Sequence, residues 1–199
     1  FGSGHSSLFA LEMYHRAGGA SFIIPVVSEA LLPSSGPQMV RVFERTPEAA
    51  NSLLRRAEPR KGEMLWIASQ SGINAAVVDL ALEAKRLGMY VVAFTSLEHS
   101  KKGTSRHPGG KKLYEVADQV MDLGGVHGDA AVSVTKDVFA GPLSGITSIF
   151  LGHSVLVGAC AKLEEQGIRC VYTSVNTAEG ERRNLEWERK ASSRDPLLR

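Results

Sequence analysis

Two short segments rich in glycine and serine combine the residue types that bind anions. The first covers residues 1–7 (Phe-Gly-Ser-Gly-His-Ser-Ser), and the second covers residues 68–74 (Ala-Ser-Gln-Ser-Gly-Ile-Asn). Glycine lets the backbone turn sharply and approach a ligand closely, while serine hydroxyls add hydrogen-bond donors without bulk. Unpaired backbone N–H groups and the positive end of a following helix favour negative charge at such a turn. Each segment is therefore a candidate phosphate-binding loop.

The second segment joins a predicted strand to a predicted helix. Residues 63–68 are typical of a buried strand, and residues 75–85 place apolar side chains at helical spacing. The first segment precedes a helical pattern over residues 8–14, but the strand expected before it would lie upstream of Phe1. We therefore expect the natural protein to contain residues before Phe1.

The remaining pattern predicts an α/β fold. Strand-like runs alternate with helical segments, which is typical of a doubly wound, Rossmann-like parallel sheet flanked by helices. We count five such runs: 21–27, 63–68, 90–94, 119–121 and 169–173. Ligands of these folds bind beyond the carboxyl ends of the strands, where both candidate loops lie. We expect a single domain over residues 1–191 and a frayed tail over 192–199.

Several residues mark helix boundaries. Thr46-Pro47-Glu48 supplies an N-cap, a first-turn proline and a first-turn acid for a helix that ends near Glu58-Pro59, and Gly88 follows the helix of residues 75–85. A long apolar helix is predicted from Pro142 to Leu163. Its small residues would suit the close approach of a second subunit, and a buried core helix explains the pattern equally well.

Composition excludes several classes of protein. The chain has 199 residues, of which 43% are apolar and 22% charged, so it can bury an ordinary core without a disulfide or a metal. A formal net charge of +2 does not favour nucleic acid. No run approaches the roughly 20 apolar residues of a membrane helix, and Cys160 and Cys170 lack metal-ligand spacing. We therefore expect a reduced, cytoplasmic protein without a membrane or nucleic-acid partner.

The second loop resembles the phosphosugar loop of the sugar isomerase (SIS) domain, which commonly reads Ser-x-Ser-Gly-x-Thr at a strand-to-helix turn. Ser69-Gln70-Ser71-Gly72 fits this pattern and is especially similar to the isomerase half of glucosamine-6-phosphate synthase, with Asn74 in place of the usual threonine. Gly2-Ser3-Gly4-His5-Ser6 resembles the glycine-rich turn after the first SIS strand. The strict Gly-x-Gly-x-x-Gly dinucleotide signature fails, because Ser7 stands where its third glycine would be.

Three further segments resemble a bacterial branch of SIS proteins that has no settled reaction and includes members labelled phosphoheptose isomerases. These segments are Phe94-Thr-Ser96, Ser105-Arg-His107 and Ser174-Val-Asn176. The resemblance implies a phosphosugar ligand and a homodimer or homotetramer with shared active sites. We expect no cofactor, and we expect no metal site because no histidine or carboxylate cluster has ligand spacing. The activity that the resemblance favours is that of an aldose–ketose isomerase. A lyase of the muramic acid 6-phosphate etherase type and a phosphosugar sensor remain as alternatives.

The resemblance and the two loops together predict the residues of the site. For the phosphosugar we expect contacts from Gly2, Ser3, Gly4, His5, Ser6, Ser69, Gln70, Ser71, Gly72, Asn74 and Ser96. Isomerisation also needs a base that moves a proton between adjacent carbons. Glu29 is the first candidate, because some SIS isomerases carry a glutamate after the second strand. His107 is the second, because histidine titrates near neutral pH.

Other polar residues have less specific interpretations. Glu12 is expected at a structural or subunit-boundary position, and His153 within the long helix is expected to be an interior or interface histidine. His15 and His127 have no partner identifiable from sequence. The polar stretch from Asn176 to Asn184 opens a charged helix. It would either close over a ligand or contact a neighbouring subunit, or simply form a polar helix start.

Overall fold

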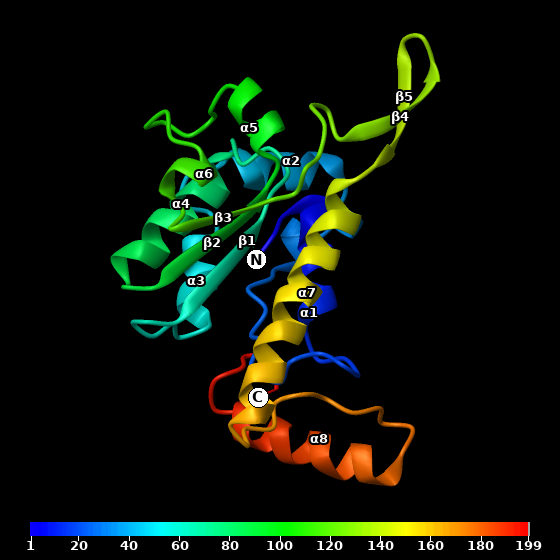
Figure 1. Cartoon of the computed structure of the whole chain (residues 1–199). Coiled ribbons are helices and arrows are strands. Elements are labelled where there is room, and N and C mark those ends of the chain that lie inside the picture. Colours follow the sequence, from blue (N-terminus) through cyan, green and yellow to red (C-terminus); the bar gives the residue numbers. More distant parts are fainter. Residues whose placement is uncertain (199) are drawn as a thin grey trace.

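A three-stranded parallel sheet forms the centre of the computed structural model, which describes residues 1–198 (Figure 1). The strands are β1 (Met64–Ala68), β2 (Tyr90–Thr95) and β3 (Gln119–Asp122), in that spatial order. Met64 lies opposite Tyr90, and Val92 lies opposite Gln119. Gly2 forms one parallel bridge with Ala68 at the free edge of β1. Phe1 and Gly2, the first residues of the first loop, therefore lie along the edge of the sheet beside β1.

The prediction of five sheet strands was wrong for two of the runs. Residues 21–27 and 169–173 do not join the sheet, and each contributes only to a short antiparallel contact centred on the Ala20–Val171 bridge. The N–H of Ser21 donates to the carbonyl of Cys170 at 2.7 Å, and the N–H of Tyr172 donates to the carbonyl of Gly19 at 2.9 Å. The two runs thus satisfy part of their backbone with each other.

Eight α-helices are present in residues 1–198, with three short 3-10 turns. The helices are α1 (Ser7–Met13), α2 (Pro37–Arg45), α3 (Asn51–Arg56), α4 (Ala75–Arg86), α5 (Leu97–Lys102), α6 (Leu113–Val116), α7 (Ser144–Glu165) and α8 (Ala178–Ala191). The turns are η1 (Gly4–Ser6), η2 (Glu29–Leu31) and η3 (Pro33–Ser35). The predicted helices after both loops and the long helix after Pro142 are confirmed.

The predicted helix start at Thr46 was wrong. Thr46 is the C-cap of α2, and the next helix begins only at Asn51. Glu48 has a φ of 58°, which a helix does not accommodate, and its N–H donates to the Asp79 carboxylate at 3.0 Å. The tertiary contact with α4 therefore outweighs the local capping signal.

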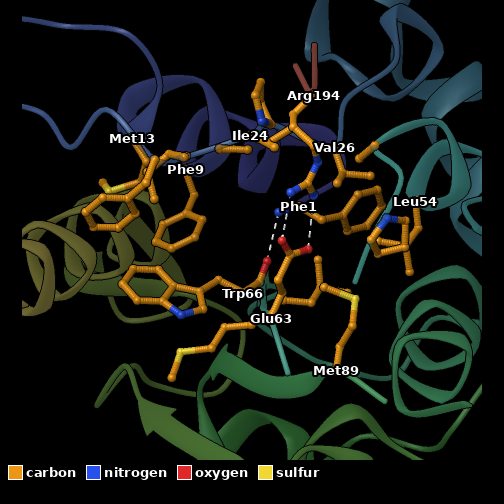
Figure 2. Close-up of a pocket in the computed structure, with 18 of the residues that line it drawn as sticks. Phe1, Phe9, Met13, Ile24, Val26, Leu54, Glu63, Trp66, Met89 and Arg194 are labelled. Carbon is orange, nitrogen blue, oxygen red and sulfur yellow. Dashed lines mark hydrogen bonds and ion pairs between the residues drawn. The ribbon is translucent and has the colours of Figure 1, made fainter. Parts of the chain in front are cut away.

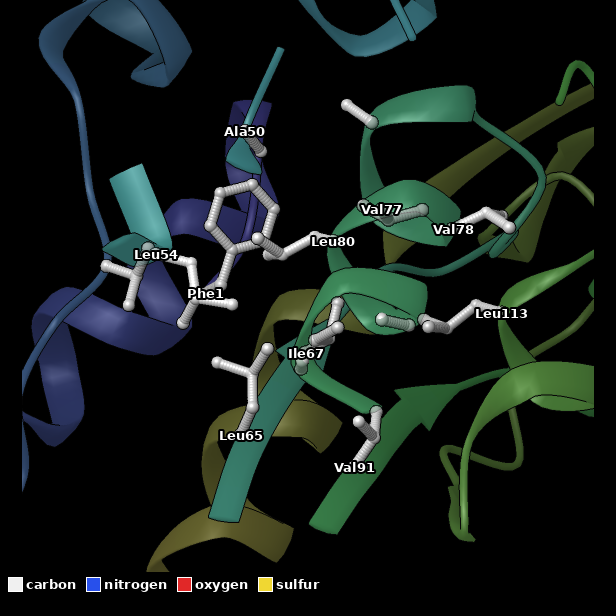
Figure 3. Close-up of a cluster of buried hydrophobic side chains, with 14 of the residues drawn as sticks. Phe1, Ala50, Leu54, Leu65, Ile67, Val77, Val78, Leu80, Val91 and Leu113 are labelled. Carbon is white, nitrogen blue, oxygen red and sulfur yellow. The ribbon is translucent and has the colours of Figure 1, made fainter. Parts of the chain in front are cut away.

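Strands β1 and β2 are largely buried on both faces, as expected for parallel strands, whereas β3 is half-buried or exposed. Alternate residues of β1 point to opposite sides, so Leu65 and Ile67 pack in one cluster with α4, while Trp66 and Ala68 contact another. Figure 3 shows the first cluster, with Phe1 and Leu54 beside the strand. In the second cluster, the Phe9 ring lies 4.8 Å from that of Phe94, which joins α1 to β2. This core holds the carboxyl ends of β1 and β2 in register.

A β-hairpin that was not predicted projects from the body (Figure 1). It consists of β4 (Ala130–Thr135) and β5 (Val138–Pro142), and most of its side chains are exposed. At its base, the Asp129 carboxylate accepts hydrogen bonds from the N–H and the hydroxyl of Ser144, at 2.9 and 2.7 Å. Asp129 therefore fixes the hairpin to the start of α7.

Helix α7 meets the length and composition of a membrane span, contrary to the sequence expectation that no run does so. Its serine, threonine and glycine residues interrupt the apolar run, but residues 144–161 contain no Asp, Glu, Lys or Arg. Ile146 and Phe150 are each 70% exposed. One such helix is weak evidence for a membrane, because helices of soluble proteins pass the same test.

The C-terminal residues pack against the body rather than standing apart from it. Arg194 donates to the Glu63 carboxylate at 3.0 Å, and Asp195 is buried. Asn184 of α8 is also buried: its side chain donates to the carbonyl of Thr173 and accepts from the N–H of Thr173. Helix α8 lies at the opposite end of the molecule from α2 and α5 (Figure 1). The polar stretch from Asn176 to Asn184 is thus remote from both loops in a single chain.

Candidate functional site

The loop after β1, residues 69–74, has its carbonyl groups held toward the protein interior. The Gln70 carbonyl accepts from Ser96 N–H and the Thr95 hydroxyl, and the Ser71 carbonyl accepts from the Ser100 hydroxyl at 2.7 Å. The next two carbonyls accept backbone N–H groups at 2.8 Å, Gly72 from Leu113 and Ile73 from Arg106. The N–H groups of Ser69 and Gly72 are bonded within the protein, to the Phe94 carbonyl and the Ser69 hydroxyl. The N–H groups of Gln70, Ser71 and Ile73 are therefore the ones available to an anion, as in an anion-binding nest.

Helix α4 begins directly behind this loop. Asn74 is its N-cap residue, yet the Asn74 side chain makes no capping hydrogen bond. The first N–H groups of a helix have no acceptor within the helix, and the helix dipole favours an anion there. Gly72, with a φ of 59°, lets the loop turn into the helix in a conformation that other residues rarely adopt. Sequence and structure therefore agree on the local geometry of this loop.

The first loop lies beside the second because Gly2 pairs with Ala68. The N–H of Ser6 donates to the Ser3 carbonyl at 3.1 Å, and the Ser7 hydroxyl donates to the Gly4 carbonyl at 2.7 Å. These bonds fold residues 3–6 into the turn η1, which leads into α1. Two glycine and serine turns thus meet at the carboxyl end of the sheet.

An open cleft of about 740 Å³ separates the two loops from α2. Its lining includes most of the predicted phosphosugar contacts: Ser3, Gly4, His5, Ser6, Ser69, Gln70, Ser71 and Asn74. The side-chain oxygen and nitrogen of Gln70 are buried and have no hydrogen-bond partner among residues 1–198. Buried polar atoms without partners are costly, and this amide lies against Gly125 rather than open to the cleft. This cleft brings glycine and serine residues of both predicted loops together.

Sequence reasoning missed a carboxylate that joins the two loops. Glu44, on α2, is half-buried and lines the cleft. Its Oε1 accepts from the Ser3 hydroxyl at 2.8 Å, and its Oε2 accepts from the Asn74 amide at 3.0 Å. The Asn74 carbonyl oxygen in turn accepts from Arg106 at 2.9 Å. The signal that could have found Glu44 is the helix itself, which Gly36-Pro37 and the spacing of Val40 and Phe43 indicate.

The cleft also carries positive and titratable side chains. Arg41, Arg45 and Arg106 line it together with His99 and Asp129. Burial first, and the nearby His127 ring second, lower the pKa of His99 below its usual value. The two imidazole rings lie 4.9 Å apart. His99 is therefore mainly neutral near pH 7, so it can accept a proton, while the arginines favour an anionic ligand.

Three predicted binding residues lie behind the cleft surface. Gly2 and Gly72 are buried and shape their turns. Ser96 is fully buried; its hydroxyl donates to the Gly125 carbonyl at 2.7 Å and accepts from His99 N–H as the cap of α5. These residues position the loops in the described chain and do not line the cleft.

The two predicted catalytic residues do not line the cleft either. Glu29 begins η2 and is exposed. The two ring nitrogens of His107 are both in hydrogen-bond contact: Nδ1 accepts from Gly109 N–H at 3.1 Å, and Nε2 lies 3.0 Å from the Asp79 carboxylate. Within one chain, this geometry gives His107 a structural position on the loop that follows α5.

The remaining histidines have identifiable surroundings. His15 lies 2.7 Å from the Glu188 carboxylate, and its ring contacts that of Tyr172 in a tilted arrangement, so it joins the end of α1 to α8. His153 lies 3.6 Å from the Glu12 carboxylate between α7 and α1. Among residues 1–198, no group of three or more His, Cys, Asp and Glu side chains is arranged to hold a metal ion. Cys160 and Cys170 are free and buried, and burial raises the pKa of Cys170 to about 11.

A second cavity, of about 370 Å³, lies at the other side of β1 and is mainly apolar (Figure 2). Phe1, Phe9, Met13 and Trp66 point into it, and the Glu63–Arg194 ion pair closes one side. Apart from Phe1, its lining includes no residue of the two loops. This cavity does not offer the donors that a phosphate group requires.

Comparisons with known proteins agree with the two-loop arrangement. A model of the SIS domain family matches residues 1–96, which contain both loops. A UPF0309 protein of Geobacillus thermodenitrificans is 36% identical over 200 residues, which cover 100% of this chain and 80% of the relative. The chain belongs to the UPF0309 family of SIS-domain proteins.

Other UPF0309 members are similarly related. The protein of Caldanaerobacter subterraneus is 35% identical over 198 residues, or 98% of this chain and 80% of the relative. That of Halalkalibacterium halodurans is 36% identical over 168 residues, or 84% of this chain and 69% of the relative. The names of these UPF0309 proteins state no reaction. Membership therefore supports the mixed α/β fold and a phosphosugar ligand, and leaves the reaction to be argued from the cleft.

Proposed function

We propose that the protein binds a phosphorylated sugar in the cleft between its two loops and interconverts the aldose and ketose forms of that sugar. The observation that carries the proposal is the hydrogen bonding of the four carbonyls of residues 70–73 within the protein, which leaves the N–H groups of Gln70, Ser71 and Ile73 for an anion at the start of α4. Ser69, Ser71 and the nearby arginines supply further donors for a phosphate.

Proton transfer needs a base within hydrogen-bond reach of the sugar. In this proposal, Glu29 and His107 act from a neighbouring subunit, or His99 acts from within the cleft. His99 is favoured by its position and by its lowered pKa, which keeps the ring ready to accept a proton. The polar surroundings then hold the sugar while the proton moves between adjacent carbons. No cofactor is needed for this chemistry.

A homodimer or homotetramer with shared active sites forms part of the proposal. Apolar side chains are exposed on α7 and on the adjoining hairpin, including Phe150, Val157 and Phe139. Exposed apolar surface of this kind marks association sites. The free, buried cysteines support a reducing compartment, and we propose the cytoplasm. The small net charge supports a small-molecule ligand rather than nucleic acid.

Incubation with a panel of heptose, hexose and amino-sugar phosphates in D2O tests the reaction. An aldose–ketose isomerase removes a proton from the carbon next to the carbonyl and returns one to the former carbonyl carbon. We therefore expect NMR to show the second isomer with deuterium on the carbon next to its new carbonyl. An etherase-type lyase would instead release a carboxylic acid from an ether-bearing sugar phosphate. A sensor would bind without turnover. Either of the last two results would replace the isomerase assignment, while the cleft would remain the proposed binding site.

A further inference from the structure

The position of Glu44 conflicts with a simple assignment of every polar group in the cleft to phosphate. Its carboxylate lies within hydrogen-bond distance of Ser3 in the first loop and Asn74 in the second. A phosphate placed on those same two donors would lie next to a negative charge, and like charges at close range repel. Ser3 and Asn74 therefore belong to a part of the cleft that suits a neutral, hydroxyl-bearing group.

The hydrogen bonds of Asn74 support this division. Its amide nitrogen donates to Glu44, and its carbonyl oxygen accepts from Arg106, so the side chain bridges a carboxylate and a guanidinium. The phosphate donors then remain the backbone N–H groups at the start of α4, with Ser71 and the arginines. The cleft thus contains an anion-binding half and, directly beside it, a half that contains Glu44.

We propose that Glu44 binds hydroxyl groups of the sugar and determines which phosphorylated ligands the cleft accepts. A carboxylate has about four lone-pair positions, and the described protein fills two of them. The remaining positions can accept hydroxyl donors from a sugar whose phosphate occupies the nest. Because Glu44 is one hydrogen bond from Asn74 at the nest, the hydroxyls that it binds are those near the phosphate-bearing end. This inference rests on the proposed function and names the part of the ligand that is selected.

Glu44→Gln tests the inference with two probes, inorganic phosphate and the sugar phosphate that binds best in the panel. The glutamine has the same shape but no charge and one acceptor oxygen. We expect the affinity for inorganic phosphate to stay constant or rise by up to about threefold, because a repelling charge is removed. We expect the affinity for the sugar phosphate to fall by about tenfold or more, because two hydroxyls lose a charged acceptor. Isothermal titration calorimetry measures both.

Glu186→Gln is the matched control, because it removes one carboxylate from α8 at the far end of the molecule. It should change neither affinity. If Glu44→Gln lowered the affinity for both probes equally, Glu44 would only hold the two loops together. If neither affinity changed, Glu44 would not contact the sugar. Each result overturns the inference.

One further variant and the wild-type result keep the test decisive. If Glu44→Gln does not fold, Glu44→Asp retains the charge but is too short to reach both loops, and the same selective loss of sugar phosphate binding is expected. If the wild-type protein binds neither probe, the proposed function fails as a whole. If it binds both and the variants do not separate them, only the role of Glu44 fails.

Discussion

Gly2→Ala is expected to lower the free energy of unfolding by about 3 kcal/mol, because an added Cβ at this position overpacks a closed turn. The ideal Cβ would collide with the carbonyl group of Ser6, which is backbone and cannot rotate away. The turn is also held from both sides, by the Gly2–Ala68 bridge and by the hydrogen bond from Ser6 N–H to the Ser3 carbonyl. The added methyl group must therefore displace the first loop from the second.

The consequence for binding is expected to be larger than that for folding. Displacement of Ser3 separates it from Glu44 and widens the cleft, so stabilisation by phosphorylated ligands should be lost. Urea denaturation measures the stability, and thermal unfolding with and without ligand measures the binding. Gly145→Ala is the control, since a Cβ there meets no atom within 4 Å and alanine favours a helix. If Gly2→Ala and Gly145→Ala behaved alike, the described packing of the first loop would be wrong.

Glu83→Gln is expected to lower the free energy of unfolding by about 2 kcal/mol at pH 7. The substitution removes a buried carboxylate that has charged hydrogen-bond partners, and the exposure of those partners to solvent makes the effect smaller than it would be for a fully buried pair. Glu83 is only 6% exposed, and it accepts hydrogen bonds from Arg86 at 2.8 and 2.9 Å and from Arg55 at 2.9 Å. These bonds join α3 to the last turn of α4, the helix that begins at the loop of residues 69–74. They also outweigh burial and lower the pKa of Glu83 to about 2.

The pH dependence of this effect has a defined sign. The folded-state pKa is depressed relative to the unfolded value near 4.3, so the stabilisation is complete above that value. It is lost as the pH falls from about 5 toward 2, when the folded carboxylate becomes protonated. The difference in unfolding free energy between the wild type and Glu83→Gln should therefore shrink across this range. If this difference stayed constant from pH 7 to pH 2.5, the hydrogen bonds of the Glu83 carboxylate with Arg55 and Arg86 would not account for the stabilisation.

Local patterns in the sequence predicted the part of the fold that holds the loops. The strands at 64–68 and 90–95 and the helix between them have buried, apolar residues at the period of their own structure, so each could be recognised without its neighbours. The run at 21–27 looked equally strand-like. Its short pairing with residues 169–173 depends on contacts nearly 150 positions away, which periodicity does not report.

The candidate site was only partly predictable for the same reason. Glycine and serine at strand ends indicated both loops, and their meeting follows from the parallel topology. Glu44 was missed because it is a single glutamate on a helix, and only the folded chain places it between Ser3 and Asn74. His107 was chosen for its chemistry, but the fold places its ring against Asp79. The Ser96 hydroxyl was assigned to the ligand, and in the fold it caps a helix.

Thermal unfolding of the purified protein with a panel of sugar phosphates tests the central claim most directly. Ligands that bind only the native state raise the unfolding temperature. The account predicts that a sugar phosphate stabilises the protein, that the parent sugar and nucleotides do not, and that Ser71→Ala weakens the effect by about tenfold in affinity, as loss of a hydroxyl donor to a charged group does. Absence of a shift with every sugar phosphate, or a shift that Ser71→Ala leaves unchanged, would contradict phosphosugar binding in this cleft.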